Sequence, residues 1–162
     1  MASHVTSEDI LEWLRKKELR YNFNESDRRI AITLSGKNTQ LEALVRREPN
    51  FDFIGCRVHY PLKVPENKRI EVCELITRIN HGFPFPSCTM SMSTGEVCWQ
   101  TYVLIAGADF HADQFGQAFY RALESADWWF PAFMAVIDGQ QTPEQAVEQI
   151  SAGFHPSREG MS

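Results

Sequence analysis

The segment from Phe110 to Ile137 constrains the fold of this chain most, because it is long, helical in its spacing and rich in large apolar side chains. Its apolar residues fall on one broad face of a helix with 3.6 residues per turn. These residues are Phe115, Ala118, Phe119, Ala122, Leu123, Ala126, Trp129 and Phe130. A face this broad needs a second apolar layer to cover it, which favours a helix packed on a sheet.

Pro131 interrupts this helical pattern. Its ring removes a backbone donor and crowds the preceding turn, so we expect a kink or a break there. Phe133, Val136 and Ile137 continue the apolar face until Asp138-Gly139 ends it.

Segments in which apolar and polar residues alternate, the period of a half-buried strand, precede the long helix. Residues 19–23 and 30–34 are two of them, and the polar turn at 24–27 predicts that they form a hairpin. A second hairpin is expected from residues 83–92 and 97–105.

Residues 39–48 fit two interpretations. Their propensity is helical, whereas Leu41, Ala43 and Val45 alternate as in a strand. We interpret them as a strand, because Pro49-Asn50 then turns into a well-patterned strand from Phe51 to Tyr60.

Three shorter helices are also predicted. The first starts at Thr6, where a hydroxyl cap precedes two acids, and ends near Lys17. The second opens at Pro65-Glu66-Asn67 and stops at Asn80-His81-Gly82. Its expected apolar face runs along Ile70, Cys73, Glu74, Ile76 and Thr77, widened by Val72, Leu75 and Ile79. The last starts with the capping box at 142–145.

The predicted fold class is therefore α+β, an antiparallel sheet with helices packed on it, in the order α-β-β-β(-β)-α-β-β-α-α. We expect a single domain over residues 1–152 and a loose polar tail over 153–162. The residues predicted to be buried together are Ile32, Val72, Ile76, Val103, Phe119 and Leu123.

Charge is distributed unevenly along the chain. Residues 1–78 carry a balance of +2, residues 79–162 carry −7, and the whole chain carries −5. A nucleic-acid binder needs a concentrated basic face, so we interpret the clusters at 15–17, 46–47 and 68–69 as separate solvated faces. No apolar run is long enough to span a membrane, and the first residues lack the pattern of a signal peptide. These features predict a cytoplasmic protein that binds neither nucleic acid nor a membrane.

The cysteines, Cys56, Cys73, Cys88 and Cys98, form no C-x-x-C pair, which argues against zinc and thioredoxin-type sites. We expect reduced thiols and no metal. A two-residue loop would set Met90 opposite Trp99, and a bulged loop would set Met90 opposite Cys98. Neither register joins Cys88 to Cys98 directly.

Motifs of catalysis and cofactor binding are absent from the sequence. It contains no Gly-x-Ser-x-Gly, no G-x-G-x-x-G and no Walker loop, so we predict no enzyme, no catalytic residue and no cofactor. Asp113, Glu124 and Asp127 are interpreted as separate solvated acids on a helix.

Large apolar residues indicate a further surface. Trp128-Trp129-Phe130 spans about 300° of a helix, so the three rings cannot all face one core. Phe83, Phe85, Met90 and Met92 add to the excess. One interpretation is plain core. The other is a partner or dimer surface formed by all seven residues, because aromatic residues and methionine are enriched in interfaces.

The order of elements resembles that of the YbjN family, bacterial proteins proposed to regulate sensory transduction, which shares a type III secretion chaperone-like fold. The likeness is best from Val64 to Ile150 and includes the segment Leu75-Ile76-Thr77-Arg78-Ile79-Asn80, the hairpin with Gly95-Glu96-Val97, the helix end Val136-Ile137-Asp138-Gly139 and the start Thr142-Pro143-Glu144. The resemblance implies a non-enzymatic, often dimeric domain that binds proteins, and it transfers no catalytic residue.

Three functional hypotheses follow. The first is a protein-interaction or regulatory domain, expected to form a homodimer through the aromatic patch. The second is a chaperone for a secreted client, and the third is an enzyme whose site converges in space without a sequence motif.

Overall fold

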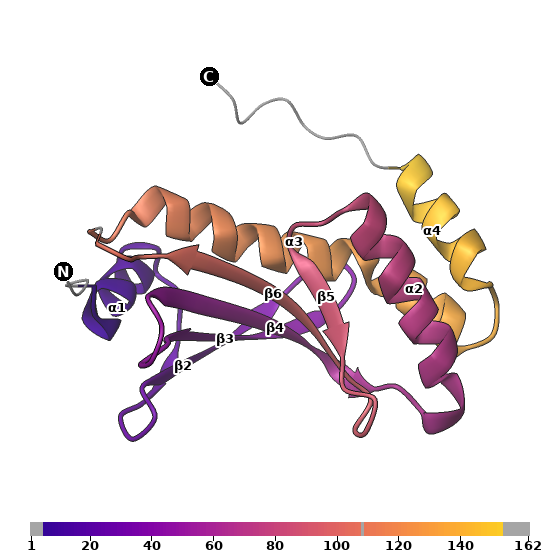
Figure 1. Cartoon of the computed structure of the whole chain (residues 1–162), viewed down its shortest axis with the longest axis horizontal. Helices are drawn as coiled ribbons and strands as arrows, with labels where there is room; N and C mark the ends of the chain where they lie inside the picture. Colours follow the sequence, from indigo (N-terminus) through magenta and orange to yellow (C-terminus); the bar gives the residue numbers. More distant parts are fainter. Residues whose placement is uncertain (1–4, 108, 154–162) are drawn as a thin grey trace.

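The computed structural model describes residues 5–107 and 109–153 (Figure 1). In chain order its elements are α1 (Ser7–Lys16), β1 (Asn22–Asn24), β2 (Arg29–Ser35), β3 (Gln40–Arg47), β4 (Phe53–Lys63), the 3-10 helix η1 (Glu66–Lys68), α2 (Arg69–Gly82), β5 (Ser87–Met90), β6 (Glu96–Leu104), α3 (Ala112–Ile137) and α4 (Pro143–Ala152). The predicted tail lies outside the described residues, apart from Gly153. The α+β class and the order of elements are confirmed, and residues 40–47 are a strand.

The six strands form one antiparallel sheet in the order β1-β2-β3-β4-β6-β5. The helices lie on one face of it, with α3 running along the sheet, α1 at one end and α2 and α4 at the other (Figure 1). The opposite face carries no helix among the residues that the structure describes. This is the arrangement expected of an antiparallel sheet with one buried and one open face.

Alternation along the strands places the core on the helix-covered face. Val45 pairs with Ile30 on one side and Cys56 on the other, and all three side chains are buried. Phe119 of α3 covers this face and is fully buried. Of the six predicted core residues, Ile32, Val72, Ile76 and Phe119 are buried, whereas Val103 and Leu123 are half-buried and pack against the same cluster.

The hairpin of β5 and β6 has neither predicted register. Met90 pairs with Val97 and Cys88 with Trp99, because residues 91–95 form a longer turn than the sequence indicated. The turn is closed by Gly95, which has a φ of +78°. A Cβ there would come within 2.3 Å of the Val64 carbonyl oxygen, so the position requires glycine.

Helix α2 buries a different face from the predicted one. Val72, Leu75, Ile76 and Ile79 are buried, whereas Ile70 is 75% exposed and Cys73 is exposed as well. The buried face is decided by packing against α4, β5 and α3, which all contact this helix.

Asn80, at the end of α2, pairs with the outer edge of β5. Its amide nitrogen donates to the Cys88 carbonyl at 2.8 Å, and the Cys88 N–H donates back to its amide oxygen at 2.9 Å. The Asn80 side chain therefore forms hydrogen bonds with two backbone groups that an edge strand would otherwise expose.

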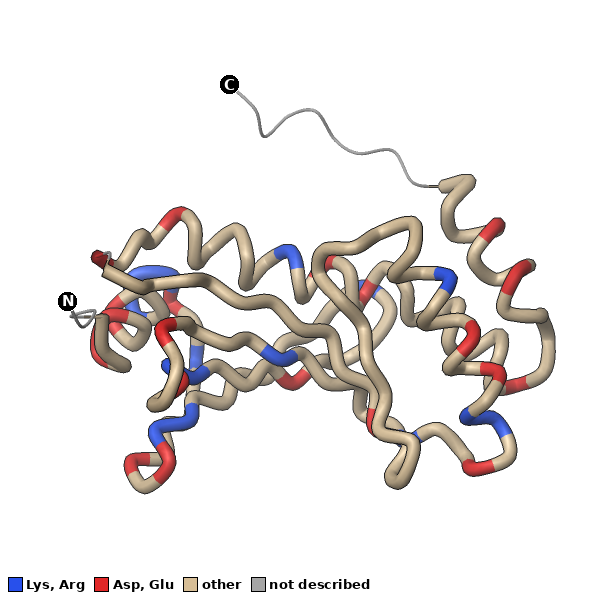
Figure 2. Tube along the Cα trace, in the orientation of Figure 1, with Lys and Arg blue, Asp and Glu red and all other residues tan. Residues whose placement is uncertain are grey.

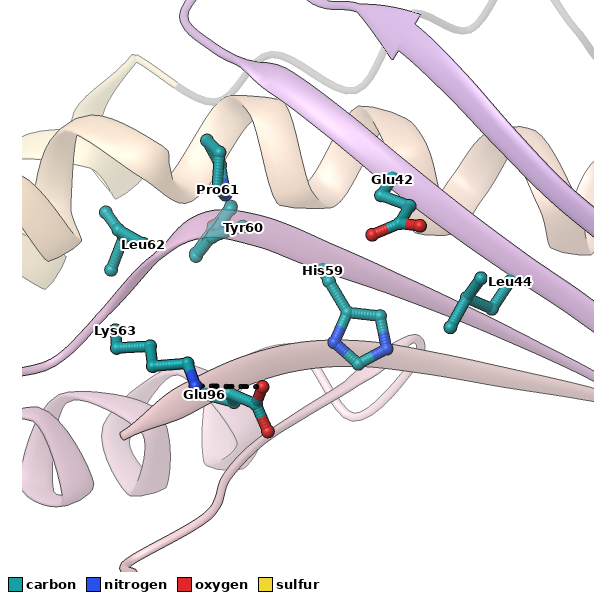
Figure 3. A pocket seen from close by; sticks show the side chains of 8 residues that line it. All are labelled: Glu42, Leu44, His59, Tyr60, Pro61, Leu62, Lys63 and Glu96. Carbon is teal, nitrogen blue, oxygen red and sulfur yellow. Dashed lines mark ion pairs between the residues drawn. The ribbon is translucent and has the colours of Figure 1, made fainter. Parts of the chain in front are cut away.

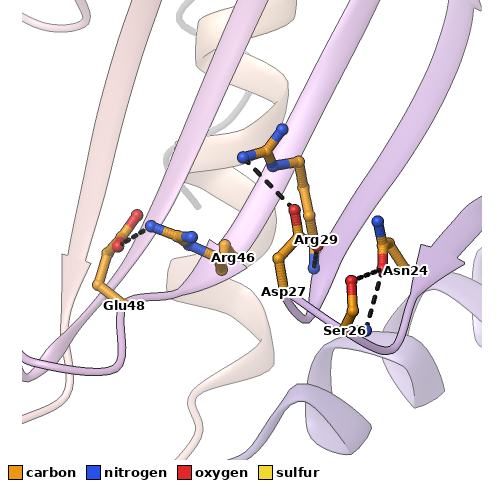
Figure 4. Close-up of polar contacts among 6 residues, drawn as sticks. All are labelled: Asn24, Ser26, Asp27, Arg29, Arg46 and Glu48. Carbon is orange, nitrogen blue, oxygen red and sulfur yellow. Dashed lines mark hydrogen bonds and ion pairs between the residues drawn. The ribbon is translucent and has the colours of Figure 1, made fainter.

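Local polar contacts define the first half of the chain. Thr6 and Asp9 form the capping box that starts α1. The Asn24 side chain accepts from the Ser26 N–H at 3.0 Å and closes the predicted turn (Figure 4). The Arg46–Glu48 ion pair lies near that turn (Figure 4).

The three basic clusters lie on separate elements. Five of their seven cations form ion pairs with neighbouring acids: Arg15 with Glu8, Lys16 with Glu12, Arg46 with Glu48, Arg47 with Asp52 and Lys68 with Glu71. Basic and acidic residues are interspersed along the chain trace (Figure 2).

Pro131 does not break α3, which continues from Ala112 to Ile137. A proline in a helix leaves the carbonyl four residues before it without its usual donor. Here that carbonyl belongs to Asp127, and the Asn38 side-chain amide donates to it at 3.0 Å. Of the two expected outcomes, a kink or a break, the break is absent, and a loop about 90 residues away supplies a donor for this carbonyl.

A candidate protein-binding groove

A groove opens between the middle of α3 and the loop that joins α2 to β5. It has a volume of about 460 Å³. It is lined by Lys37, Asn38, Phe83, Phe85, Pro86, Trp99, Arg121, Glu124, Ser125, Asp127, Trp128 and Trp129. Residues from four separate parts of the sequence, the β2–β3 loop, the α2–β5 loop, β6 and α3, therefore meet at this site.

The apolar wall of the groove consists of aromatic side chains. Phe85 is 58% exposed and Trp128 is 39% exposed, so both side chains present apolar surface at the site. Phe83 is half-buried and packs edge-on against Trp129, with ring centroids 5.4 Å apart. The Phe85–Pro86 peptide bond is cis.

The Trp128-Trp129-Phe130 run divides as the helical spacing predicts. Trp128 is exposed in the groove, Trp129 is 3% exposed and belongs to the core, and half-buried Phe130 packs edge-on against Tyr60. The two methionines lie apart from the groove lining: Met90 is half-buried against the core, and Met92 is exposed beside the turn of the β5–β6 hairpin. Of the seven residues singled out in the sequence, the groove brings together Phe83, Phe85, Trp128 and Trp129.

A buried polar network supports the helix behind the groove. The Tyr60 hydroxyl donates to the Ala126 carbonyl at 2.7 Å and accepts from the Trp99 indole nitrogen at 3.0 Å. Burial raises the pKa of Tyr60 well above its ordinary value, so the phenol is neutral. This network attaches α3 to strands β4 and β6.

The loop between β2 and β3 is held to α3 by the Asp127 carboxylate. This group accepts hydrogen bonds from the backbone N–H groups of Lys37, Asn38 and Thr39 at 2.9, 2.8 and 3.1 Å. Gly36 makes room for it, because a Cβ there would lie 2.1 Å from Asp127 Oδ1. The interpretation of Asp127 as a separate solvated acid was therefore wrong.

The rim of the groove carries two cations. Lys37 reaches it from the loop that Asp127 holds, and Arg121 lies on α3. Within residues 5–107 and 109–153, neither side chain forms an ion pair or a hydrogen bond. Glu124, one turn after Arg121, is the exposed acid of the same rim.

A second hollow, of about 410 Å³, lies on the open face of the sheet around His59 (Figure 3). The imidazole lies between Glu42 and Glu96, and Glu96 pairs with Lys63 at 3.6 Å (Figure 3). Burial lowers the pKa of His59 below its ordinary value of 6.5, in spite of the two acids. Its lining contains no serine, threonine or cysteine, so it holds no hydroxyl or thiol nucleophile beside this base.

Three of the cysteines are buried. Burial raises the pKa of Cys56 to about 12 and that of Cys98 to about 11, and it raises the pKa of Cys88 well above its ordinary value. Neutral, enclosed thiols of this kind are poor nucleophiles. Among the described residues, no three His, Cys, Asp or Glu side chains gather closely enough to hold a metal ion.

The residues of the aromatic wall were predicted from the sequence, whereas those of the polar rim were not. Lys37, Arg121 and Glu124 have no distinctive spacing, and their meeting depends on how the β2–β3 loop docks on α3. A signal for that docking was available in Pro131, because its missing N–H left the Asp127 carbonyl in need of another donor.

No helix within the described part of the chain is long and apolar enough to cross a membrane. A search of curated proteins gave no match. The sequence model of the YbjN family, described as "Putative bacterial sensory transduction regulator", matches residues 6–135. The match includes the N-terminal third and ends before α4.

Proposed function

Since the chain belongs to the YbjN family, we propose that it is a non-enzymatic regulatory domain that acts by binding another protein in the cytoplasm. A regulatory or protein-interaction role agrees with the description of that family. The observation that carries the proposal is the groove on α3, where Phe85 and Trp128 are exposed above a rigid, hydrogen-bonded support.

The groove has the composition of a protein-binding site. Exposed aromatic side chains next to charged residues are typical of interface centres and their rims. Its back wall is a helix fixed to the sheet by Tyr60 and to the β2–β3 loop by Asp127. A preformed wall lowers the entropic cost of binding, because few of its side chains have to be ordered.

Affinity capture from the native cell, followed by mass spectrometry, tests this proposal. We expect a protein to be recovered with the wild-type chain and lost with Phe85→Asp. Ile70→Asp is the matched control, because Ile70 is 75% exposed and lies outside the groove lining. Recovery of the same proteins with all three chains would contradict a role for the groove.

We also propose that the chain forms a homodimer, through the open face of the sheet. Support comes from a corner of that face where Phe51 and Leu104 are 62% and 78% exposed. Between them the rings of Phe53 and Tyr102 are in edge contact at 5.1 Å. An exposed apolar cluster of this kind is typical of an interface, and a twofold contact would bury it on both subunits.

Light scattering over a dilution series tests the homodimer. We expect about twice 18.6 kDa for the wild-type chain and the monomer mass for Leu104→Asp. A monomer mass for the wild-type chain at tens of micromolar would exclude the dimer.

A further inference from the structure

The groove on α3 combines an aromatic wall with two cations that have no acidic partner among the described residues. A ligand for such a site has to satisfy both features. The chemistry of the aromatic wall and of the cationic rim therefore restricts which segment of a partner can bind here. This inference rests on the proposed function.

The aromatic wall selects an apolar side chain. Phe85 and Trp128 present ring surface to solvent, and Pro86 is buried beside them. Removing such surface from water is favourable. An aromatic residue of the partner, placed between these rings, gains this burial and the ring contacts that aromatic pairs prefer.

The cations select a negative charge. Arg121 is the single Lys or Arg among the described residues from 79 to 153, and it lies in this groove. Lys37, in the β2–β3 loop, adds a second positive charge to the rim. The Arg guanidinium in particular binds carboxylates through paired hydrogen bonds.

The two acids of the groove differ in how far their oxygens are already hydrogen-bonded. The Asp127 carboxylate already accepts three backbone N–H groups. It is thus engaged in holding the loop, which leaves Glu124 as the acid that faces the solvent at the rim. The four charges of the lining balance formally, but Lys37 and Arg121 have no acidic partner among the described residues, so both remain available to a carboxylate of the ligand.

We propose that the groove binds an extended acidic segment of a partner protein, with one aromatic side chain in the wall and an adjacent Asp or Glu at Arg121 and Lys37. The aromatic residue supplies the affinity, and the carboxylate determines the orientation of the segment along α3.

Selection from a random library of twelve-residue peptides on the immobilised full chain tests this inference. We expect the enriched peptides to carry an aromatic residue next to Asp or Glu and to be lost on the Phe85→Asp variant. The affinity of the best peptide should fall about tenfold or more with Arg121→Glu. Arg57→Glu is the matched control, because Arg57 is exposed on the other face of the sheet and the change in net charge is the same. Thermal unfolding of both variants verifies that they are folded.

The outcomes separate this inference from the proposed function. Groove-dependent peptides enriched in Lys or Arg would overturn the acidic ligand and leave a protein-binding groove. Equal losses with Arg121→Glu and Arg57→Glu would overturn the role of Arg121. Conversion of a dimer to a monomer by Phe85→Asp would show that a second copy of the chain occupies the groove, which also overturns the inference.

Discussion

The Asn38 side-chain amide donates a hydrogen bond of 3.0 Å to the main-chain carbonyl of Asp127, one turn before Pro131. The helix thus keeps a partner for the carbonyl that the proline leaves without an intrahelical donor. Because Lys37 belongs to the same loop, this contact also places one of the two cations of the groove.

A double-mutant cycle of Asn38→Ala and Pro131→Ala measures that relationship. Asn38→Ala should lower the free energy of unfolding by about 1 kcal/mol, since it leaves a carbonyl poorly satisfied. In a Pro131→Ala background residue 131 again has an N–H for this carbonyl, so the loss should be smaller. Urea unfolding of the four chains gives the coupling. Equal losses in both backgrounds would show that Asn38 does not compensate for the proline.

Gly36→Ala should detach the β2–β3 loop from α3. The added Cβ would lie 2.1 Å from Asp127 Oδ1, so the carboxylate has to move away from the N–H groups that donate hydrogen bonds to it. We expect a loss of about 1–3 kcal/mol in the free energy of unfolding. Gly82→Ala is the matched control, because a Cβ there meets nothing within 4 Å and alanine favours a helix. A comparable loss in both variants would argue against a specific role for Gly36.

The fold was largely predictable where one face of an element is buried. Ile30, Ile32 and Leu34 alternate with the small or polar residues Ala31 and Thr33, and this alternation identified β2 without any tertiary information. The buried face of α2 was harder to predict, because its own apolar residues lie on several sides of the helix. Tertiary packing decides which of them are buried: Val72 is buried and Ile70 is exposed.

The candidate site was predictable only in its aromatic part. The helical angle between successive residues indicated that one of the three rings at 128–130 faces outward. No local pattern indicates that Asp127 accepts N–H groups from residues 37–39, because the contact depends on the docking of two distant segments. The rim cations depend on the same docking.

Thiol reactivity tests the burial of the cysteines. Burial raises the pKa values of Cys56, Cys88 and Cys98, so their thiols stay protonated and react slowly. Iodoacetamide at pH 8 should therefore label only the exposed Cys73 in the folded chain. The other three should react only after unfolding, and Cys73→Ser should abolish labelling of the native protein. Mass spectrometry that found several labelled cysteines in the folded chain would contradict this burial.

His59 should make the fold less stable in acid. Burial lowers the pKa of His59 below 6.5, so the unfolded chain takes up this proton at a higher pH than the folded chain does. Its contribution to stability is therefore present above pH 6.5 and is lost as the pH falls through the folded pKa. The neighbouring charges are Glu42 and Glu96, which raise the pKa, and Arg57 and Arg29, which lower it.

The comparison is urea unfolding at pH 7.5 and 5.5 for the wild-type chain and for His59→Asn. The wild-type chain should lose more stability between the two values than the variant does. An identical pH dependence in both chains would show that His59 makes no such contribution.

Site-specific photo-crosslinking in the native cell tests the central claim, that the groove on α3 binds another protein. A photoreactive phenylalanine analogue replaces Phe85 in one chain and Ile70 in the control, since both positions are exposed. We expect a dominant crosslinked protein from position 85 that is missing from position 70. The absence of a crosslink at position 85, or the same products from both positions, would contradict it.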